Sequence, residues 1–379
     1  MIRFGIVGGG NVAAIHRRAA ALDNAACLSA GCLSRDRETN HRLGAAWNIP
    51  EDRIYDYCEE MAEQEAARPD SIDFAVVATP NSSHFPIAAA FLRHGIHVLC
   101  EKPMTTTVQE AQALQALADS TGSLLCVNYS YSGYPMLHQA RAMIRNGQIG
   151  QVVKVVAEYR QDNQILPGST VKSWHYDPQI SGPGGCVADI GTHIAYLASF
   201  VTDLQIEEVS AMLTNTIPEI PLDTDFSAMI RFQGGAVGTL WGSKVAVGDD
   251  CGIRLHVIGT LGSLQWSHRA PDQLIYAPLG GPLATYTAGR SYLAPEVQVM
   301  CRLSSGHMEG HFSAIGNLYR AFIADVAAKK AGEPPSKDAY PDGTAGLDGV
   351  AWIQACCASS RAGGAWTRLH TDCQSDTTH

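Results

Sequence analysis

The feature that most constrains the fold is an apolar run at the N-terminus that leads directly into glycines. Residues 2–7 (IRFGIV) are rich in apolar side chains and show no sharp alternation, the pattern of a strand buried on both faces of a parallel sheet. The glycine-rich stretch 8–13 (GGGNVA) follows at once, and residues 14–22 can form a helix. A strand, a glycine turn and a helix in this order predict the start of a doubly wound α/β fold.

The glycine stretch has the spacing of a loop that holds a dinucleotide. Gly8 permits a tight turn, Gly10 lets a pyrophosphate approach the backbone, and Ala13 is small enough for close packing of the helix. The N-terminus of that helix would face the anion. We therefore expect a cofactor site that also includes Asn11 and Val12.

The second strand of this unit bears on the choice of cofactor. Residues 28–33 should end beside the adenosine ribose, where an acidic side chain would hold the 2′-hydroxyl of NAD. This chain has Ser34 and Arg35 there, and a hydroxyl with a guanidinium suits a 2′-phosphate better. NADP is therefore favoured over NAD. Two alternatives stay open: Asp36 could reach the ribose of NAD, and Arg35 could be an exposed loop charge.

The next strands end in polar residues at the edge where parallel sheets bind ligands. Residues 72–78 lead into Thr79, Pro80 and Asn81, which we expect to face the cofactor. His84 follows on the first turn of a helix, where it is either a cofactor contact or a packed or capping histidine.

A lysine follows the strand 96–100. Glu101, Lys102 and a proline come directly after it, and Asn128 follows the last strand of the first half. A lysine at the carboxyl end of a central strand is held at the ligand-binding edge, where its ammonium could polarise a substrate oxygen. We expect these three polar residues at the cofactor site.

The stretch 184–193 (GGCVADIGTH) places a carboxylate and an imidazole four residues apart. If the stretch is helical, Asp189 and His193 lie on one face, about one turn apart. The pair could perform acid–base chemistry or simply stabilise a helix. A metal site is not expected, because Cys186 is the nearest further ligand and no His or Cys motif of ligand spacing follows.

Taken together, these motifs resemble the glucose-fructose oxidoreductase / inositol dehydrogenase (Gfo/Idh/MocA) family over nearly the whole chain. The resemblance rests on residues 8–13, 78–81, 101–103 and 189–193. It implies a Rossmann domain and an α/β domain with an open, mostly antiparallel sheet that often forms a subunit interface. It also implies that Lys102, Asp189 and His193 form the catalytic set, and that the bond from Lys102 to the next residue is cis.

The resemblance and the later β-rich runs predict two domains. The NAD(P)-binding Rossmann domain should cover residues 1–127, the substrate domain 128–370, and a mobile polar tail 371–379. Apolar residues on an uncovered sheet face would favour a homodimer or homotetramer. The stretch 306–311 (GHMEGH) is similar to a levoglucosan dehydrogenase-like subgroup that acts on unphosphorylated sugars and anhydrosugars.

Several residues of the second half could bind a carbohydrate. Tyr131 lies where many members of the family have an arginine nearby, which makes the expected pocket more aromatic. Gln161 could hydrogen-bond hydroxyls, or belong to an ordinary loop. Trp174 and His175 offer an apolar face with a polar edge, although Trp174 could also fill the core.

Composition excludes several partners. The chain has 27 basic and 37 acidic residues, a net charge of −10 and no basic run, so nucleic acid is not an expected partner. The N-terminal apolar run is too short for a signal peptide, and no membrane segment is expected. The 11 cysteines show no paired spacing, which fits free thiols and a cytoplasmic protein.

These features predict a nicotinamide-dependent oxidoreductase of carbohydrate metabolism that acts on a secondary hydroxyl of a sugar, anhydrosugar or polyol. His193 would take the hydroxyl proton, Lys102 would stabilise the alkoxide, and Asp189 would anchor a neighbouring hydroxyl. The base could be His193 or Lys102. The alternatives are an NAD(P)-dependent glycosidase of similar fold and a non-catalytic sugar sensor.

Overall fold

The computed structural model describes residues 1–166, 173–336 and 339–369, and the chain divides into two compact units. The first unit comprises Met1–Ser130 and Ile315–Leu347, and the second comprises Tyr131–Ala314 and the chain from Asp348 on. The predicted tail, residues 371–379, lies outside the described residues.

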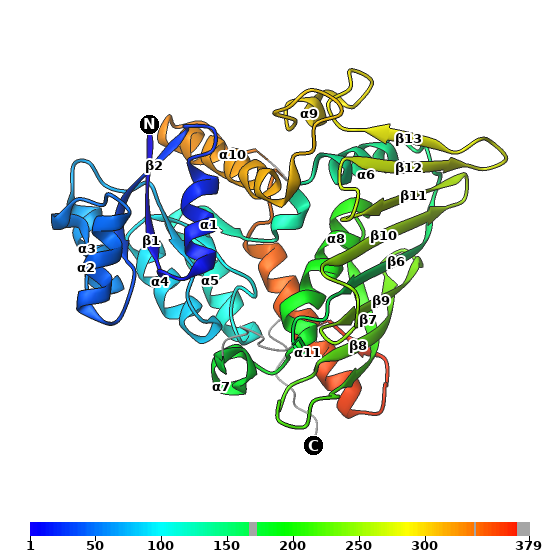
Figure 1. The fold of residues 1–379 in the computed structure, drawn as a ribbon, viewed down its shortest axis with the longest axis horizontal. Helices are drawn as coiled ribbons and strands as arrows, with labels where there is room; N and C mark the ends of the chain where they lie inside the picture. The colour runs from blue at the N-terminus through cyan, green and yellow to red at the C-terminus, as the bar shows by residue number, and fades with distance from the viewer. Residues whose placement is uncertain (167–172, 337–338, 370–379) are drawn as a thin grey trace. The chain divides into compact units, whose positions relative to one another are not determined.

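The described part of the first unit contains a five-stranded parallel sheet in the order β2-β1-β3-β4-β5, with helices between successive strands (Figure 1). This confirms the predicted doubly wound sheet. Its elements are β1 (Ile2–Val7), α1 (Asn11–Ala20), β2 (Ala26–Cys32), α2 (Arg37–Ala46), α3 (Cys58–Ala67), β3 (Phe74–Val77), α4 (His84–Arg93), β4 (His97–Cys100), α5 (Val108–Thr121) and β5 (Leu125–Val127).

A helix from late in the chain completes the core of the first unit. The ring of Phe74 on β3 stacks on Phe4 of β1 at 5.3 Å between centroids. On its other side, Phe322 of α10 (Gly310–Lys330) meets Phe74 edge-on at 5.2 Å. All three side chains are fully buried. The predicted division at residue 127 therefore differs from the structure, because the apolar side of α10 covers the first sheet.

The described part of the second unit contains a nine-stranded sheet in the order β13-β12-β11-β10-β6-β9-β8-β7-β14. Among these described strands the pair β6 and β9 is parallel and the other neighbours are antiparallel, as expected for an open, mostly antiparallel sheet. The elements are α6 (Pro135–Arg145), β6 (Val152–Arg160), α7 (Pro178–Ser181), α8 (Thr192–Thr202), β7 (Ile206–Thr214), β8 (Asp225–Phe232), β9 (Val237–Ser243), β10 (Gly252–Gly259), β11 (Gly262–Ser267), β12 (Gln273–Pro278), β13 (Ala284–Thr287), α9 (Pro295–Gln298) and β14 (Thr367–Arg368), with α11 (Gly343–Arg361) spanning the boundary at Leu347.

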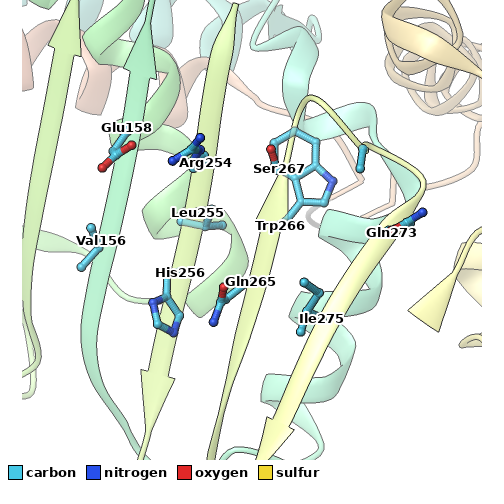
Figure 2. Close-up of a pocket in the computed structure, with 11 residues that line it drawn as sticks. Val156, Glu158, Arg254, Leu255, His256, Gln265, Trp266, Ser267, Gln273 and Ile275 are labelled. Atoms are coloured by element: carbon cyan, nitrogen blue, oxygen red, sulfur yellow. The ribbon is translucent and has the colours of Figure 1, made fainter. Parts of the chain in front are cut away.

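The two faces of this sheet differ in burial. Along β8, Phe226 and Ile230 point into the core while Met229 is 54% exposed, the alternation expected when one face is covered. Helices α6 and α8 lie against the covered face (Figure 1). The opposite, outer face carries a hollow of about 400 Å³ over β6, β10, β11 and β12, where polar side chains such as His256 and Gln265 line up across the strands (Figure 2).

The described ranges contain neither a candidate membrane span nor a candidate metal-binding cluster. None of their helices combines the length and the apolar character that a bilayer span requires. Within the same residues, no three His, Cys, Asp or Glu side chains are grouped so that they could hold a metal ion.

Candidate active site

The glycine loop after β1 has the geometry that a bound diphosphate needs. Gly8 has a φ of +107°, and a Cβ there would lie 2.3 Å from the carbonyl oxygen of Ala78, so a side chain is excluded. Gly10 is the N-cap of α1 and brings no side chain to cap the helix. Ala13 is fully buried behind the loop. The first-turn N–H groups of α1 therefore suit an anion, as expected.

The polar residues that follow β2 make different contacts. The backbone N–H of Asp36 donates to the Ser34 hydroxyl at 3.1 Å. The Asp36 carboxylate accepts from the backbone N–H of Thr39 at 2.9 Å and caps α2, and hydrogen bonds from the side chain and the backbone of Thr39 lower the pKa of Asp36. Arg35 is exposed beside them. The carboxylate that could have served NAD is thus used as a helix cap.

A buried carboxylate fixes the turn that carries Lys102. Glu101 Oε2 accepts from the backbone N–H of Lys102 at 3.1 Å. Its Oε1 accepts from Asn128 Nδ2 at 2.6 Å and lies 2.8 Å from Nε2 of His16. Burial alone would raise the pKa of Glu101, but His16, Lys102 and Asn128 together outweigh it and lower the pKa to about 2. The bond from Lys102 to the next residue is cis, as the resemblance implied.

His84 is a packed histidine, one of the two roles expected for it. Its side chain is 1% exposed, with Nε2 2.8 Å from the carbonyl oxygen of Thr79 and Nδ1 2.9 Å from that of Pro103. Burial lowers the pKa of His84, so the ring is neutral at pH 7. The ring therefore ties the turn at 79–81, where Asn81 is buried, to the Lys102 turn instead of facing a cofactor.

In the second unit, Asp189 does not lie in a regular α-helix. Residues Val187–Gly191 form one turn of π-helix that continues directly into α8. The stretch is therefore helical, as the expected spacing required, but its i→i+5 bonds make the turn around Asp189 wider than an α-helical one. Such π turns occur frequently at functional sites.

A second buried acid holds this π turn in place. Asp223 accepts hydrogen bonds from the backbone N–H groups of Gly185 at 2.6 Å and Val187 at 2.8 Å. A Cβ on Gly185 would lie 2.4 Å from the carbonyl oxygen of Asp223, which explains the glycine. Burial raises the pKa of Asp223. The start of the motif is thus anchored to the loop before β8.

Asp189 forms an ion pair with a lysine that the sequence analysis missed. Nζ of Lys244, the residue after β9, lies 2.6 Å from Asp189 Oδ2. The lysine side chain is 3% exposed and the aspartate side chain 28%. Burial alone would lower the pKa of Lys244, but Asp189 outweighs it and the pKa is raised. The buried ammonium of Lys244 is therefore charged at neutral pH, with Asp189 as its partner.

His193 lies in an aromatic surrounding that includes the predicted Tyr131. The two rings meet edge-on at 4.8 Å between centroids. The Tyr131 ring also lies 4.6 Å from that of His311, and its hydroxyl is 2.7 Å from the hydroxyl of Tyr159. His193 is therefore surrounded by aromatic rings of the second unit.

The other predicted substrate residues lie on nearby loops of the second unit. The rings of Trp174 and His175 stack at 3.6 Å and are half-buried, so Trp174 does not fill the core. Tyr176, the next residue, is close enough to Lys244 and Asp189 to interact with both charges. Gln161 extends β6, and its backbone N–H donates to the carbonyl of Ser243 at 2.8 Å.

Both halves of the chain match one family of enzymes. Residues 2–129 match the oxidoreductase family with an NAD-binding Rossmann fold, and residues 137–265 match the GFO/IDH/MocA C-terminal domain. The uncharacterized oxidoreductase YfiI of Bacillus subtilis is 33% identical over 97% of each chain. The chain belongs to the GFO/IDH/MocA family of oxidoreductases.

Relatives of this GFO/IDH/MocA oxidoreductase include proteins that are named for, or were solved with, a substrate. An inositol dehydrogenase homolog from Azotobacter vinelandii, complexed with NAD+, shares 34% identity over 97% of both chains with a TM-score of 0.92. The same homolog was also solved with NADH and myo-inositol, with a TM-score of 0.89 to this chain. Levoglucosan dehydrogenase of Pseudarthrobacter phenanthrenivorans is 30% identical over 52% of this chain and 56% of its own length.

The site of this GFO/IDH/MocA enzyme also contains a cysteine, Cys251, that local sequence patterns did not indicate. Its Sγ lies 3.4 Å from the hydroxyl oxygens of both Tyr131 and Tyr159, and Nδ1 of His268 lies 3.1 Å from the carbonyl oxygen of Cys251. Burial alone would raise the pKa of Cys251, but the nearby His268 ring and the two tyrosine hydroxyls outweigh it and lower the pKa. No sequence motif indicates this pair, because the two residues lie 17 positions apart, Cys251 just before β10 and His268 just after β11.

We expect iodoacetamide to alkylate Cys251 at lower pH than an ordinary thiol, because the thiolate is the reactive form. The rate at Cys251 should level off at a lower pH than the rate at an ordinary thiol does. Cys301 is an internal control: it is also half-buried, but burial raises its pKa, so its rate should still rise above that pH. Peptide mass spectrometry measures both rates in one sample, and parallel pH profiles would contradict the prediction.

Proposed function

We propose that this oxidoreductase transfers a hydride between a nicotinamide cofactor and a secondary hydroxyl of a sugar, anhydrosugar or polyol, with Lys102, Asp189 and His193 as the catalytic set. The observation that carries the proposal is the polar centre of the second unit, where an ionised acid and an imidazole lie among tyrosine rings. Hydroxyl-rich substrates need such polar contacts for their hydroxyls and aromatic faces for their C–H groups.

Each group of the set has a distinct role in the proposal. His193 takes the proton from the reacting hydroxyl in the oxidative direction, and the ammonium of Lys102 stabilises the alkoxide that develops. Asp189, held ionised by Lys244, accepts a hydrogen bond from a neighbouring hydroxyl. A nicotinamide cofactor, whose diphosphate the Gly8–Ala13 loop and the N-terminus of α1 would hold, would supply the hydride acceptor.

The names of the relatives narrow the substrate class. The homolog solved with myo-inositol covers nearly the whole chain, whereas the match to levoglucosan dehydrogenase covers about half of it. Both ligands are rigid rings with several secondary hydroxyls and no charge. We infer that this chain also takes an uncharged cyclic polyol or sugar.

A screen of inositols, free sugars and anhydrosugars with both cofactors tests this function. Cofactor reduction, followed by absorbance, should appear with at least one uncharged ring substrate and be lost in a His193→Ala variant. Reduction with none of them would overturn the proposal. Release of an aglycone from a glycoside without net cofactor reduction would indicate an NAD(P)-dependent glycosidase instead.

We propose NADP as the preferred cofactor, because Arg35 is exposed while Asp36 is used as the cap of α2. Replacing Arg35 by alanine should weaken NADP binding roughly 10- to 100-fold, the value of a hydrogen bond to a charged group, and leave NAD binding nearly unchanged. Titration of each cofactor by fluorescence measures both effects. Arg37→Ala, exposed on the same helix end, is the matched control. Equal losses for NAD and NADP would contradict the proposed preference.

We also propose that the chain assembles with copies of itself through the outer face of the nine-stranded sheet. That face exposes Met212, Met229, Val237 and Ile275, which lie on four different strands. Light scattering should give the mass of a dimer or tetramer, and Met229→Glu should lower it. Met308→Glu, at an exposed methionine outside the sheet, should not. A monomeric wild-type protein would contradict this assembly.

A further inference from the structure

In the ion pair between Lys244 and Asp189 the lysine is the more deeply buried partner, which is unusual. In an ordinary surface pair the long lysine side chain is solvated, as in Lys330–Asp73, where the lysine side chain is 55% exposed and the aspartate 12%. At Lys244 the order is reversed, with the ammonium 3% exposed and the carboxylate 28%. The cation therefore lies beneath the acid, and the acid is the member that solvent or a ligand can reach.

Burying an ammonium is costly unless a partner compensates for the lost hydration. The other ionisable groups that act on this pair are Tyr176, Cys186 and Asp223. Burial raises the pKa of both Tyr176 and Cys186, so these two side chains are neutral at pH 7. The compensation for the ammonium comes from the carboxylates, and Asp189 is the one at hydrogen-bond distance.

We propose that Lys244 is a positioning residue that holds Asp189 ionised and oriented for the substrate. This inference rests on the proposed function and adds a residue to its site. A lysine fixed under the carboxylate keeps one oxygen, Oδ2, occupied by the protein. The ionised group then accepts a hydrogen bond from a hydroxyl of the substrate more strongly than a neutral acid could.

The test compares Lys244→Met, which keeps the length of the side chain and removes the charge, with Lys244→Arg, which keeps the charge. In Lys244→Met the carboxylate loses its cation, so the acidic limb of the kcat/KM profile should move to higher pH. KM for the substrate should rise roughly 10-fold or more, as expected for a weakened hydrogen bond to a charged group. Cofactor affinity should stay unchanged, and Lys244→Arg should restore most of both effects.

A control and an independent readout separate this role from a structural one. Lys330→Met removes the ammonium of the Lys330–Asp73 pair, which also joins Nζ and a carboxylate oxygen at 2.6 Å, and should leave the pH profile unchanged. Titration of the side-chain carboxyls by carbon NMR, with Asp189→Asn to identify the signal, follows Asp189 without any substrate. In Lys244→Met this signal should titrate at higher pH than in the wild type.

The two proposals fail in different ways. If the screen finds no substrate but the Asp189 signal moves in Lys244→Met, the proposed function fails while the electrostatic role of Lys244 stands. If the Asp189 signal titrates identically in the wild type and Lys244→Met, the inference on Lys244 is overturned, whatever the activity. A loss of activity that is equal at every pH and is not restored by Lys244→Arg would overturn it as well.

Discussion

Replacing Lys102 by alanine is expected to lower kcat roughly 10³-fold, while cofactor affinity stays close to that of the wild type. The ammonium is assigned to the alkoxide that develops during hydride transfer, so its loss acts on the transition state more than on binding. The fold should survive, because the turn is held by the buried Glu101, which bonds the backbone of Lys102 and not its side chain.

Steady-state kinetics measure kcat, and a cofactor titration measures the affinity for the cofactor. Lys330→Ala is the control, since it removes an exposed ammonium from α10 of the same unit and should leave kcat unchanged. A Lys102→Ala enzyme with kcat within a few-fold of the wild type would remove Lys102 from the catalytic set. A variant that loses cofactor binding instead would assign Lys102 to the cofactor site.

The second large effect is expected on stability, from Arg53→Met in the first unit. Arg53 follows α2, and its guanidinium forms two hydrogen bonds with Glu65 of α3, one of them Nε to Oε1 at 2.9 Å. Glu65 has no exposed surface and also accepts from the Tyr55 hydroxyl at 2.8 Å. Removing the arginine leaves a buried carboxylate without its cation, which costs about 3–5 kcal/mol of unfolding free energy.

Denaturant unfolding with and without a second change tests this explanation. Arg68→Met breaks ion pairs with Asp52 and Asp70 that are 67% and 45% exposed, and should cost at most about 1 kcal/mol. Adding Glu65→Gln to Arg53→Met should recover part of the loss, since the charge is then absent. An Arg53→Met protein as stable as Arg68→Met would show that the pair contributes little.

The parts of the fold that were predicted correctly depend on local pattern. The strand before Gly8 follows from an apolar run that leads into glycines, and the helix α1 follows those glycines as expected. The assignment of α10 could not be predicted in this way. Helical periodicity shows which face is apolar, but the sheet that this face covers, here through Phe322 on Phe74, is decided by the whole fold.

The candidate site also contains residues that the sequence predicted and residues that it could not predict. Asp189, His193 and Tyr131 come from motifs, and the structure brings His193 and Tyr131 into ring contact. Lys244 could not be predicted, because nothing in the local sequence shows that the end of β9 lies beside the π turn, 55 positions earlier in the chain. The π turn itself has no reliable pattern, since its wider hydrogen bonding depends on anchors such as Asp223.

The place of α10 in the first unit bears on how the protein is made. The parallel sheet is fully translated by residue 127, yet the helix that buries Phe74 ends at Lys330. A ribosome therefore adds about 200 residues after the sheet, which takes roughly 10 to 40 seconds at ordinary elongation rates, before α10 can pack on this sheet. During that interval an apolar surface of the nascent protein stays open to chaperones, and a fragment that stops at residue 130 would retain this exposure permanently.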